Sequence, residues 1–315
     1  MKALPADLDA LAAGGKAALA RCLSALETAP DDPALAALLD AAIADPRGIV
    51  LGLTGPPGVG KSTLTNAFVS DLRRRDMTVG IIAVDPSSRR SGGALLGDRT
   101  RIETDPDDSG VFLRSMAARR RLGGLADLTF PAVVLMRALF DVVFVETVGV
   151  GQSETEIAEC SDLVVFCVQP GSGDSLQFMK AGVMEVPDIV LVTKGDMGTI
   201  ARRAAADVRG ALSLSAEAGR APDVAIVSAL DGGGISEAID LFFGRARMHR
   251  DDGVLCRRRA DQSSAWIESR LRESFGTLGL AAVAPLIDGV DSPFRDYAKL
   301  ASRARDALQT VIETI

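Results

Sequence analysis

Histidine, paired cysteines and long apolar runs are scarce in this chain of 315 residues, and each shortage argues against a class of protein. The single histidine is His249, so histidine-based acid–base chemistry and a histidine-rich metal store are not expected. His249 lies among charged residues, which predicts a solvated side chain. The four cysteines form no CxxC pair, and Cys160 and Cys167 lie in or near apolar segments. We therefore expect buried, reduced thiols rather than a disulfide framework.

Membrane and nucleic-acid partners are also disfavoured by what is missing. No uninterrupted apolar run reaches the ~18 residues that a membrane helix needs, and the N-terminus lacks a basic-then-apolar signal pattern. We expect no membrane insertion and a cytoplasmic location. The net charge of −7 argues against long DNA or RNA as a partner.

What the chain does contain is a phosphate-binding loop between an apolar run at 49–53 and a segment with helical spacing. A strand, a glycine turn and a helix start form a strong anion site, because backbone N–H groups converge on the oxygens and the helix dipole favours negative charge. We expect Lys61 to reach the β- and γ-phosphates and Ser62 to be a Mg²⁺ ligand. The loop predicts a binder of nucleoside triphosphates; its residues are Gly55, Pro56, Pro57, Gly58, Val59, Gly60, Lys61, Ser62 and Thr63.

Short apolar runs alternate with helix-length segments through the middle of the chain. This pattern is typical of parallel strands covered on both faces by crossover helices, and no tight hairpin signal joins any two runs. The sequence predicts an α/β fold of the P-loop NTPase kind, with a mainly parallel central sheet flanked by helices. The expected strands are 49–53, 79–84, 142–146, 163–168, 189–193 and 224–227.

Carboxylates follow two of these predicted strands, where phosphate chemistry needs a metal. Glu146 ends one strand and is followed by a glycine turn and Gln152, while Asp85 ends another. Asp98 lies in a glycine-rich loop that could fold over the nucleotide. We expect Ser62, Asp85 and Glu146 to surround Mg²⁺. A helix-capping carboxylate is the alternative for Glu146, and a solvated connection is the alternative for the long loop.

A base-recognition segment follows the strand at 189–193. Thr193 and Lys194 lead to Asp196, which approximates the N/T-K-x-D guanine signature. A carboxylate at Asp196 would accept the N1–H and 2-amino groups of guanine, which adenine lacks, while the Lys194 stem would pack on the base. Backbone N–H groups of the segment Ser228, Ala229 and Leu230 are expected to contact guanine O6. The bound nucleotide is therefore predicted to be GTP or GDP.

Both ends of the chain are predicted to be helical. Residues 6–44 read as two helices, the second capped by Asp32 with Pro33 in its first position. Residues 250–260 read as a linker or a solvated helix start, and a final helix is expected over about 294–315. The predicted organisation is an N-terminal helical extension at 1–47, a P-loop GTPase domain at 48–248 and a C-terminal helical arm at 249–315.

Over roughly 48–245 the chain resembles the MeaB/ArgK group of P-loop GTPases, the methylmalonyl-CoA mutase-associated type. The motifs are GPPGVGKST at 55–63, VDPSSRRSGGALLGDRTRI at 84–102, RLGGLA at 121–126, ETVGVGQSE at 146–154 and QPGSGDSLQFMKAG at 169–182. The resemblance implies a GTPase that guards or reactivates a coenzyme-B12-dependent acyl-CoA mutase. It also implies a third switch at 171–180, with Asp174 and Lys180 responding to a partner, and a homodimer joined through the C-terminal helices. The chain departs from the family pattern in two places. Thr193 stands in place of the usual asparagine, and the run at 119–121 is more basic than the family pattern. This run would alter the partner surface or would simply be a solvated turn.

The predicted reaction is in-line attack by water on the γ-phosphorus of GTP, with Lys61, Gln152 and Asp98 as catalytic candidates. Gln152 would orient the water, or would simply be a polar residue at a helix start. Three rival functions stay open at this point. They are an ATP-dependent kinase or ATPase coupled to lysine, arginine or ornithine transport, a metallocentre-insertion GTPase, and a binding module with negligible hydrolysis.

Overall fold

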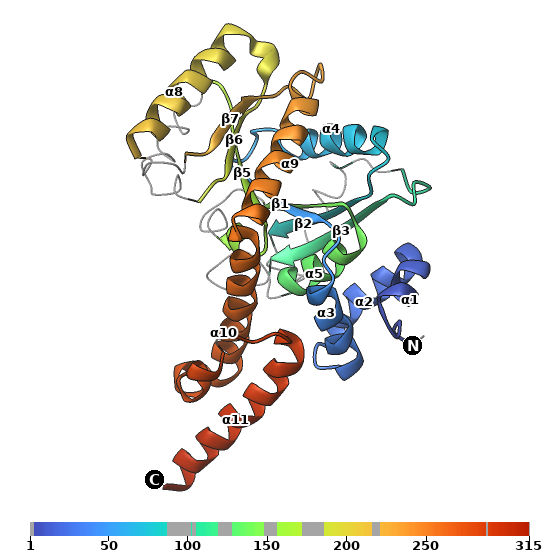
Figure 1. Ribbon diagram of the computed structural model, residues 1–315, viewed down its shortest axis with the longest axis vertical. Helices are drawn as coiled ribbons and strands as arrows, with labels where there is room; N and C mark the ends of the chain where they lie inside the picture. The colour runs from blue at the N-terminus through green and yellow to red at the C-terminus, as the bar shows by residue number, and fades with distance from the viewer. Residues whose placement is uncertain are drawn as a thin grey trace. The chain divides into compact units, whose positions relative to one another are not determined.

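A computed structural model describes residues 3–86, 102, 105–118, 128–147, 156–171, 186–215, 221–287 and 289–314. The chain divides into two compact units. The first combines Met1–Gly48, Asp127–Leu139 and Gly253–Ile315, and it is helical (Figure 1). The second comprises Ile49–Ala126 and Phe140–Asp252, and it contains the sheet.

The sheet of the second unit has seven strands in the order β3-β2-β4-β1-β5-β6-β7, and every neighbouring pair is parallel. The predicted all-parallel α/β fold is therefore confirmed. The strands are β1 (Ile49–Thr54), β2 (Val79–Pro86), β3 (Val111–Ala118), β4 (Val142–Thr147), β5 (Leu163–Val168), β6 (Ile189–Val192) and β7 (Asp223–Ile226).

Sequence analysis missed β3, the strand at one edge of the sheet. Arg114 and Ser115 interrupt its apolar residues, so no continuous apolar run marks it. An edge strand has a neighbour on one side only, here β2, and therefore does not need to be apolar throughout.

An aspartate directly before a strand recurs at the amino-terminal edge of the sheet. The Asp162 carboxylate, just before β5, accepts a hydrogen bond from the backbone N–H of Val50 in β1 at 2.9 Å. Asp188, just before β6, accepts one from Val164 in β5 at 2.8 Å. Each carboxylate extends the backbone ladder by one bond, which fixes the register of neighbouring strands at the edge opposite their carboxyl ends.

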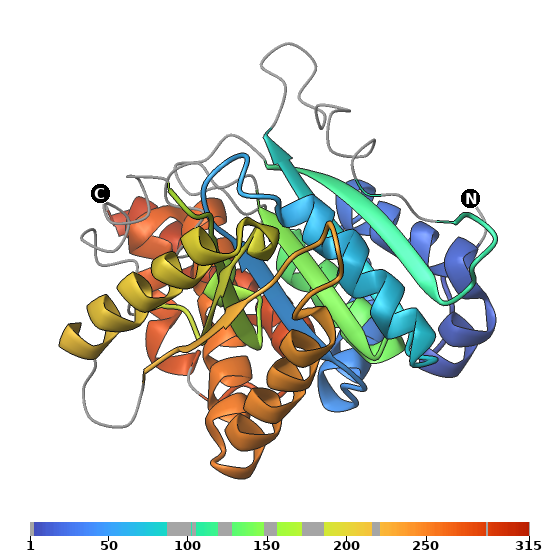
Figure 2. The same cartoon turned by 90° about the horizontal axis from the view of Figure 1, so that it is seen from above.

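Helices cover both faces of the sheet, as Figure 2 shows for α4 (Lys61–Arg74) and α9 (Ile235–Asp251) on one face. Phe68 of α4 stacks on Phe144 of β4 with ring centroids 5.9 Å apart, and it meets Phe242 of α9 edge-on at 5.3 Å. The alternate residues of β5 and β6 point to the opposite face and pack on α8 (Thr199–Ser215).

The helical unit contains α1 (Leu8–Ala13), α2 (Gly15–Thr28), α3 (Pro33–Ala44), α5 (Thr129–Leu139), α10 (Val254–Val283) and α11 (Pro293–Thr314). Residues 6–44 form three helices instead of the two expected, because Gly15 has φ +55° and breaks the first one. The capping prediction for α3 is confirmed, since the Asp32 carboxylate accepts from the Ala34 N–H at 2.8 Å. The 250–260 segment is largely helical, with Arg250 in α9 and Arg257, Arg258 and Arg259 in α10.

The expectation of a solvated His249 was wrong. His249 is 8 % exposed, and its Nε2 lies 3.7 Å from Asp188 Oδ1. α9 continues to Asp251, and His249 falls on the same helical face as the buried Phe242 and Ala246. The cysteine prediction is confirmed, because Cys160 and Cys167 are buried free thiols.

Candidate functional site

The phosphate loop lies at the carboxyl end of β1, in the second unit. β1 ends at Thr54, α4 begins at Lys61, and three of the loop's glycines have positive φ: Gly55, Gly58 and Gly60. A Cβ on Gly55 would lie 2.3 Å from the Cys167 carbonyl oxygen, so only glycine allows the loop to pass this close to β5. The strand, turn and helix of an anion site are present as predicted.

Lys61 is held inside this loop. Its side chain is buried, and Nζ donates to the carbonyl oxygens of Gly55 at 2.7 Å and Pro56 at 3.2 Å. These two hydrogen bonds position the ammonium group at the start of α4. The arrangement suits an anion that approaches the loop from the carboxyl edge of the sheet.

Glu146 and Ser62 come together beside the loop. Ser62 Oγ donates to Glu146 Oε1 at 2.6 Å, and Thr65 Oγ1 lies 3.2 Å from Glu146 Oε2. Glu146 is 8 % exposed, so a carboxylate and two hydroxyl oxygens meet in a largely water-excluded place. Hard oxygen donors of this kind suit Mg²⁺. Among the described residues, no group of three or more His, Cys, Asp or Glu side chains could hold a metal, so these oxygens would form only part of a coordination shell.

The sheet register brings Asp85 to the same edge as Glu146. Ala83 of β2 pairs with Glu146 of β4, and Asp85 follows two residues further along β2. Asp98 and Gln152 lie outside the described residues, as do most of the 171–180 segment and the basic run at 119–121. Their predicted roles stay predictions.

The base-recognition residues meet at the carboxyl ends of β6 and β7. Asp196 is exposed, and its Oδ1 accepts a hydrogen bond from Ser228 Oγ at 3.0 Å. Lys194 has the left-handed backbone conformation, with φ +54°, and its Nζ donates to Gln169 Oε1 at 2.5 Å. A non-glycine residue in this conformation is strained, and such strain is often retained where it orients functional groups.

Thr193, which replaces the asparagine of the signature, links this segment to the phosphate loop. Its Oγ1 lies 2.9 Å from the Val59 carbonyl oxygen and 3.1 Å from that of Val168. The hydroxyl group is buried, so it fixes the spacing between the two loops.

Part of the segment 228–230, predicted to contact guanine O6, already forms hydrogen bonds within the protein. The Ser228 N–H donates to the Gly233 carbonyl oxygen at 2.8 Å, so the predicted contact with guanine O6 falls to the N–H groups of Ala229 and Leu230. The Leu230 side chain is 84 % exposed, which leaves this part of the loop open to a ligand.

Sequence analysis missed two residues of this site, Thr65 and Gln169. Thr65 lies one helical turn after Lys61, on the same face, and this spacing is a signal that could have been used. Gln169 directly follows β5, and β5 neighbours β6, so the two strand ends meet at one edge. In the sequence, Gln169 stands out only as the first residue of the family motif at 169–182.

Cys167 lies under the phosphate loop and is not a nucleophile. Burial raises the pKa of its thiol to about 12, with the Lys61 charge opposing this shift and the Glu146 charge adding to it. A neutral thiol is a small apolar group here.

Comparison with known proteins agrees with this geometry. Residues 19–281 match the sequence model of the family described as "Methylmalonyl Co-A mutase-associated GTPase MeaB". A Caulobacter vibrioides protein that carries a GTPase name is 37 % identical over 96 % of this chain and 97 % of its own length. The "Methylmalonic aciduria type A homolog, mitochondrial" of Mus musculus is 38 % identical over 71 % of this chain and 55 % of its own length. A crystal structure of "LAO/AO transport system kinase" has a TM-score of 0.65 at 29 % identity and covers 94 % of this chain and 96 % of that one.

Proposed function

Because the chain belongs to the family of methylmalonyl-CoA mutase-associated GTPases, we propose that it acts as a GTP-driven chaperone or reactivation switch for a coenzyme-B12-dependent acyl-CoA mutase. The family description and the mammalian relative's name support this partner. The expected homodimer belongs to the same proposal.

The observation that carries the choice of GTP is the Asp196 carboxylate, which is exposed and accepts a hydrogen bond from Ser228 Oγ at 3.0 Å. Its two oxygens would accept the N1–H and 2-amino groups of guanine. Adenine offers neither donor, so ATP would leave a carboxylate without its hydrogen bonds.

In the proposed reaction, water attacks the γ-phosphorus of GTP in line with the leaving GDP oxygen. The N–H groups of the loop at 55–63 would orient the phosphates, and Lys61 would neutralise charge on the β- and γ-phosphates. Gln152 is proposed to orient the water, with Asp98 completing the site.

The oxygens of Ser62 and Glu146 fit Mg²⁺, and we propose that Asp85 and Asp98 complete the protein's share of its shell. Bound Mg²⁺ would supply charge neutralisation at the phosphates. The residues of this chain would position the ion, because Ser62 and Thr65 both lie within hydrogen-bond distance of the Glu146 carboxylate and hold it in place.

Competition binding tests the nucleotide assignment. We expect GDP and GTP to bind with micromolar or tighter affinity and ATP to compete at least about 100-fold more weakly, since two hydrogen bonds to a charged group are lost. Preference for ATP would instead support the second candidate, a transport-coupled kinase, which the name of the similar solved structure suggests.

Co-purification with coenzyme-B12-dependent acyl-CoA mutases from the same cell tests the partner. We expect one mutase to bind with an affinity that differs between GTP- and GDP-loaded protein, and to accelerate hydrolysis. The proposed partner would be wrong if no mutase changed the rate of GTP hydrolysis and none bound the GTP- and GDP-loaded forms with different affinity. The protein would then be a GTPase with another partner.

A further inference from the structure

A cavity of about 600 Å³ lies within the helical unit, lined by none of the residues assigned to the nucleotide. Its walls come from α2, α3 and the segment between them, from the start of α5, and from α10 and α11, and every lining residue belongs to that one unit. A volume of this size accommodates a drug-sized molecule. We refer to it as the α10–α11 cavity.

Aromatic side chains form much of the wall of the α10–α11 cavity. The Trp266 ring lies 4.6 Å from that of Phe294 and 5.7 Å from that of Tyr297, centroid to centroid. Phe275 and Leu39 also line the space. Phe294 is buried, whereas Trp266, Phe275 and Tyr297 are partly exposed. An apolar body in the cavity would remove these three rings from water.

The charged groups that line the same cavity are mainly cationic: Arg270, Arg295 and Arg305, against one carboxylate, Asp31. Arg295 is already paired, since its Nε lies 2.8 Å from the buried Asp40 carboxylate. Arg270 differs, because its Nη2 is 3.9 Å from Asp31 Oδ1, beyond hydrogen-bond distance. Its guanidinium carbon lies 5.3 Å from the centroid of the Tyr297 ring, which orients the side chain while leaving its N–H groups able to bind an anion.

We propose that the α10–α11 cavity binds an amphipathic organic anion, with an aromatic or branched apolar body and one carboxylate, phosphate or sulfonate group. The body would cover Trp266 and Tyr297, and the anion would pair with Arg270 and Arg305. A neutral apolar compound would bring no anionic partner to Arg305 or to Arg270, whose contact with Asp31 is 3.9 Å long. A small inorganic anion would leave the aromatic wall exposed to water. The proposal does not depend on the proposed function.

Trp266 is the only tryptophan of the chain, so its fluorescence reports on this cavity alone. The probe is 8-anilinonaphthalene-1-sulfonate, titrated into the full-length protein with excitation at the tryptophan band. We expect saturable binding of one probe per chain, with quenching of Trp266 and energy transfer to the probe. N-phenyl-1-naphthylamine has the same aromatic body without the sulfonate, and we expect it to bind about tenfold more weakly.

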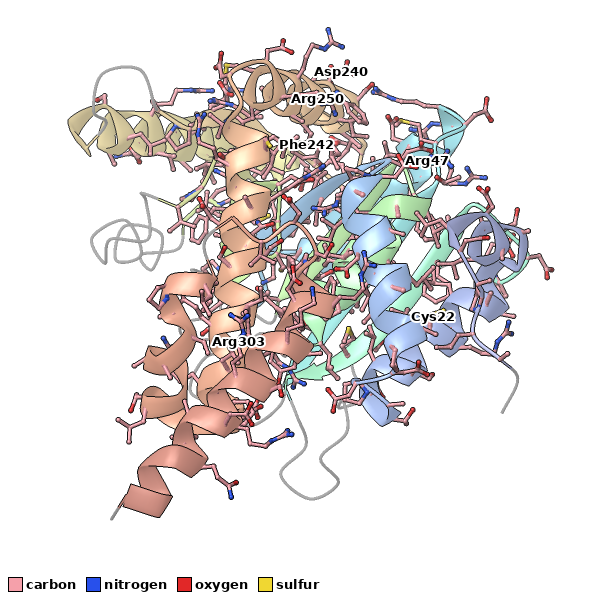
Figure 3. All side chains as sticks on the ribbon, turned by 60° about the horizontal axis from the view of Figure 1, so that its bottom comes forward. Cys22, Arg47, Asp240, Phe242, Arg250 and Arg303 are labelled. Carbon is pink, nitrogen blue, oxygen red and sulfur yellow. The ribbon has the colours of Figure 1, made fainter. Side chains whose placement is uncertain are left out.

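Substitutions at the cavity wall test whether the probe binds in the cavity. Ala298 of α11 lines it and is exposed, and Ala298→Phe is expected to abolish binding of both probes. The change Arg270→Gln with Arg305→Gln is expected to weaken the sulfonate about tenfold and the neutral probe little. Arg303→Gln is the matched control, because Arg303 is an exposed arginine of the same helix (Figure 3) and does not line the cavity. Circular dichroism checks that each variant is folded.

Three results would overturn the proposal. One is the absence of saturable binding to the folded protein, and another is equal affinity for the two probes. The third is that light scattering shows a dimer which excludes the probe and which Ala298→Phe dissociates, since a second copy would then occupy the cavity.

Discussion

At the residue scale, the proposed recognition of the base depends on one carboxylate. Asp196 accepts a hydrogen bond from Ser228 Oγ. Thr193, directly after β6, donates one to the Val59 carbonyl oxygen of the phosphate loop. A single substitution at Asp196 can therefore change specificity while leaving the phosphate contacts in place.

We predict that Asp196→Asn exchanges guanine for xanthine. An asparagine amide can donate to the 2-oxo group of xanthine, but it cannot accept from both guanine donors. GTP should bind about 100-fold more weakly, and xanthosine triphosphate should bind better than it does to the unmodified protein. The measurement is competition against a labelled nucleotide. Asp231→Asn is the control, since Asp231 lies on the neighbouring loop, and equal losses in both variants would contradict the role given to Asp196.

The cysteines differ in reactivity for a physical reason. Cys160 and Cys167 are buried with pKa values raised to about 12 by desolvation, whereas Cys256 is exposed. A raised pKa keeps the thiol neutral in the folded protein as pH rises, and this contribution to stability is lost only as pH rises from the ordinary value near 9.0 towards 12.

We therefore predict that iodoacetamide at pH 8.5 modifies Cys256 and leaves Cys160 and Cys167 intact until the protein is unfolded in urea. Mass spectrometry of tryptic peptides reads the pattern. Rapid modification of Cys167 in the folded protein would show that the space beneath the phosphate loop opens.

At the element scale, buried aspartates join segments that are distant in the sequence. Asp40 of α3 is 4 % exposed, and it accepts from the backbone N–H groups of Phe294 at 3.0 Å and Arg295 at 3.1 Å, in the first turn of α11. It also bonds to the Arg295 guanidinium at 2.8 Å. A carboxylate at a helix N-terminus satisfies N–H groups that have no intrahelical partner and interacts favourably with the dipole.

We predict that Asp40→Ala lowers the free energy of unfolding by about 2–3 kcal/mol, because it leaves donors buried without an acceptor. Asp45→Ala, at the exposed end of the same helix, should cost less than about 0.5 kcal/mol. Urea unfolding followed by circular dichroism measures both. Equal effects would mean that water replaces the Asp40 carboxylate at the start of α11.

The elements that could be predicted are those whose signal is local. Neighbouring residues alone identify three such features, and the structure contains all of them: the strand at 163–168, the cap at Asp32 and the phosphate loop. β3 and the buried side chain of His249 were not found, because both depend on which neighbour they meet. The bond between Thr193 and Val59 spans 134 positions, and only the sheet order brings the two together.

At the scale of the whole molecule, the proposed nucleotide site and the single tryptophan, Trp266, lie in different compact units. The phosphate loop and Asp196 belong to the unit that contains the sheet, while Trp266 belongs to the helical unit. Each unit has its own apolar core, the first around Ile267 and Leu271 and the second around Phe68 and Phe144. A ligand that binds only the folded form of one unit stabilises that unit directly and the other only through their coupling.

We predict that saturating Mg·GDP raises the melting temperature seen by circular dichroism more than the one seen by Trp266 fluorescence. At a ligand concentration of 100 times Kd, the stabilisation of the binding unit is about 2.7 kcal/mol. The helical unit shares in it only as far as the two units unfold together, and separate cores favour separate transitions. Adenosine diphosphate at the same concentration is the control and should move neither signal. Coincident transitions that shift equally with Mg·GDP would mean that the two units unfold together and share the stabilisation.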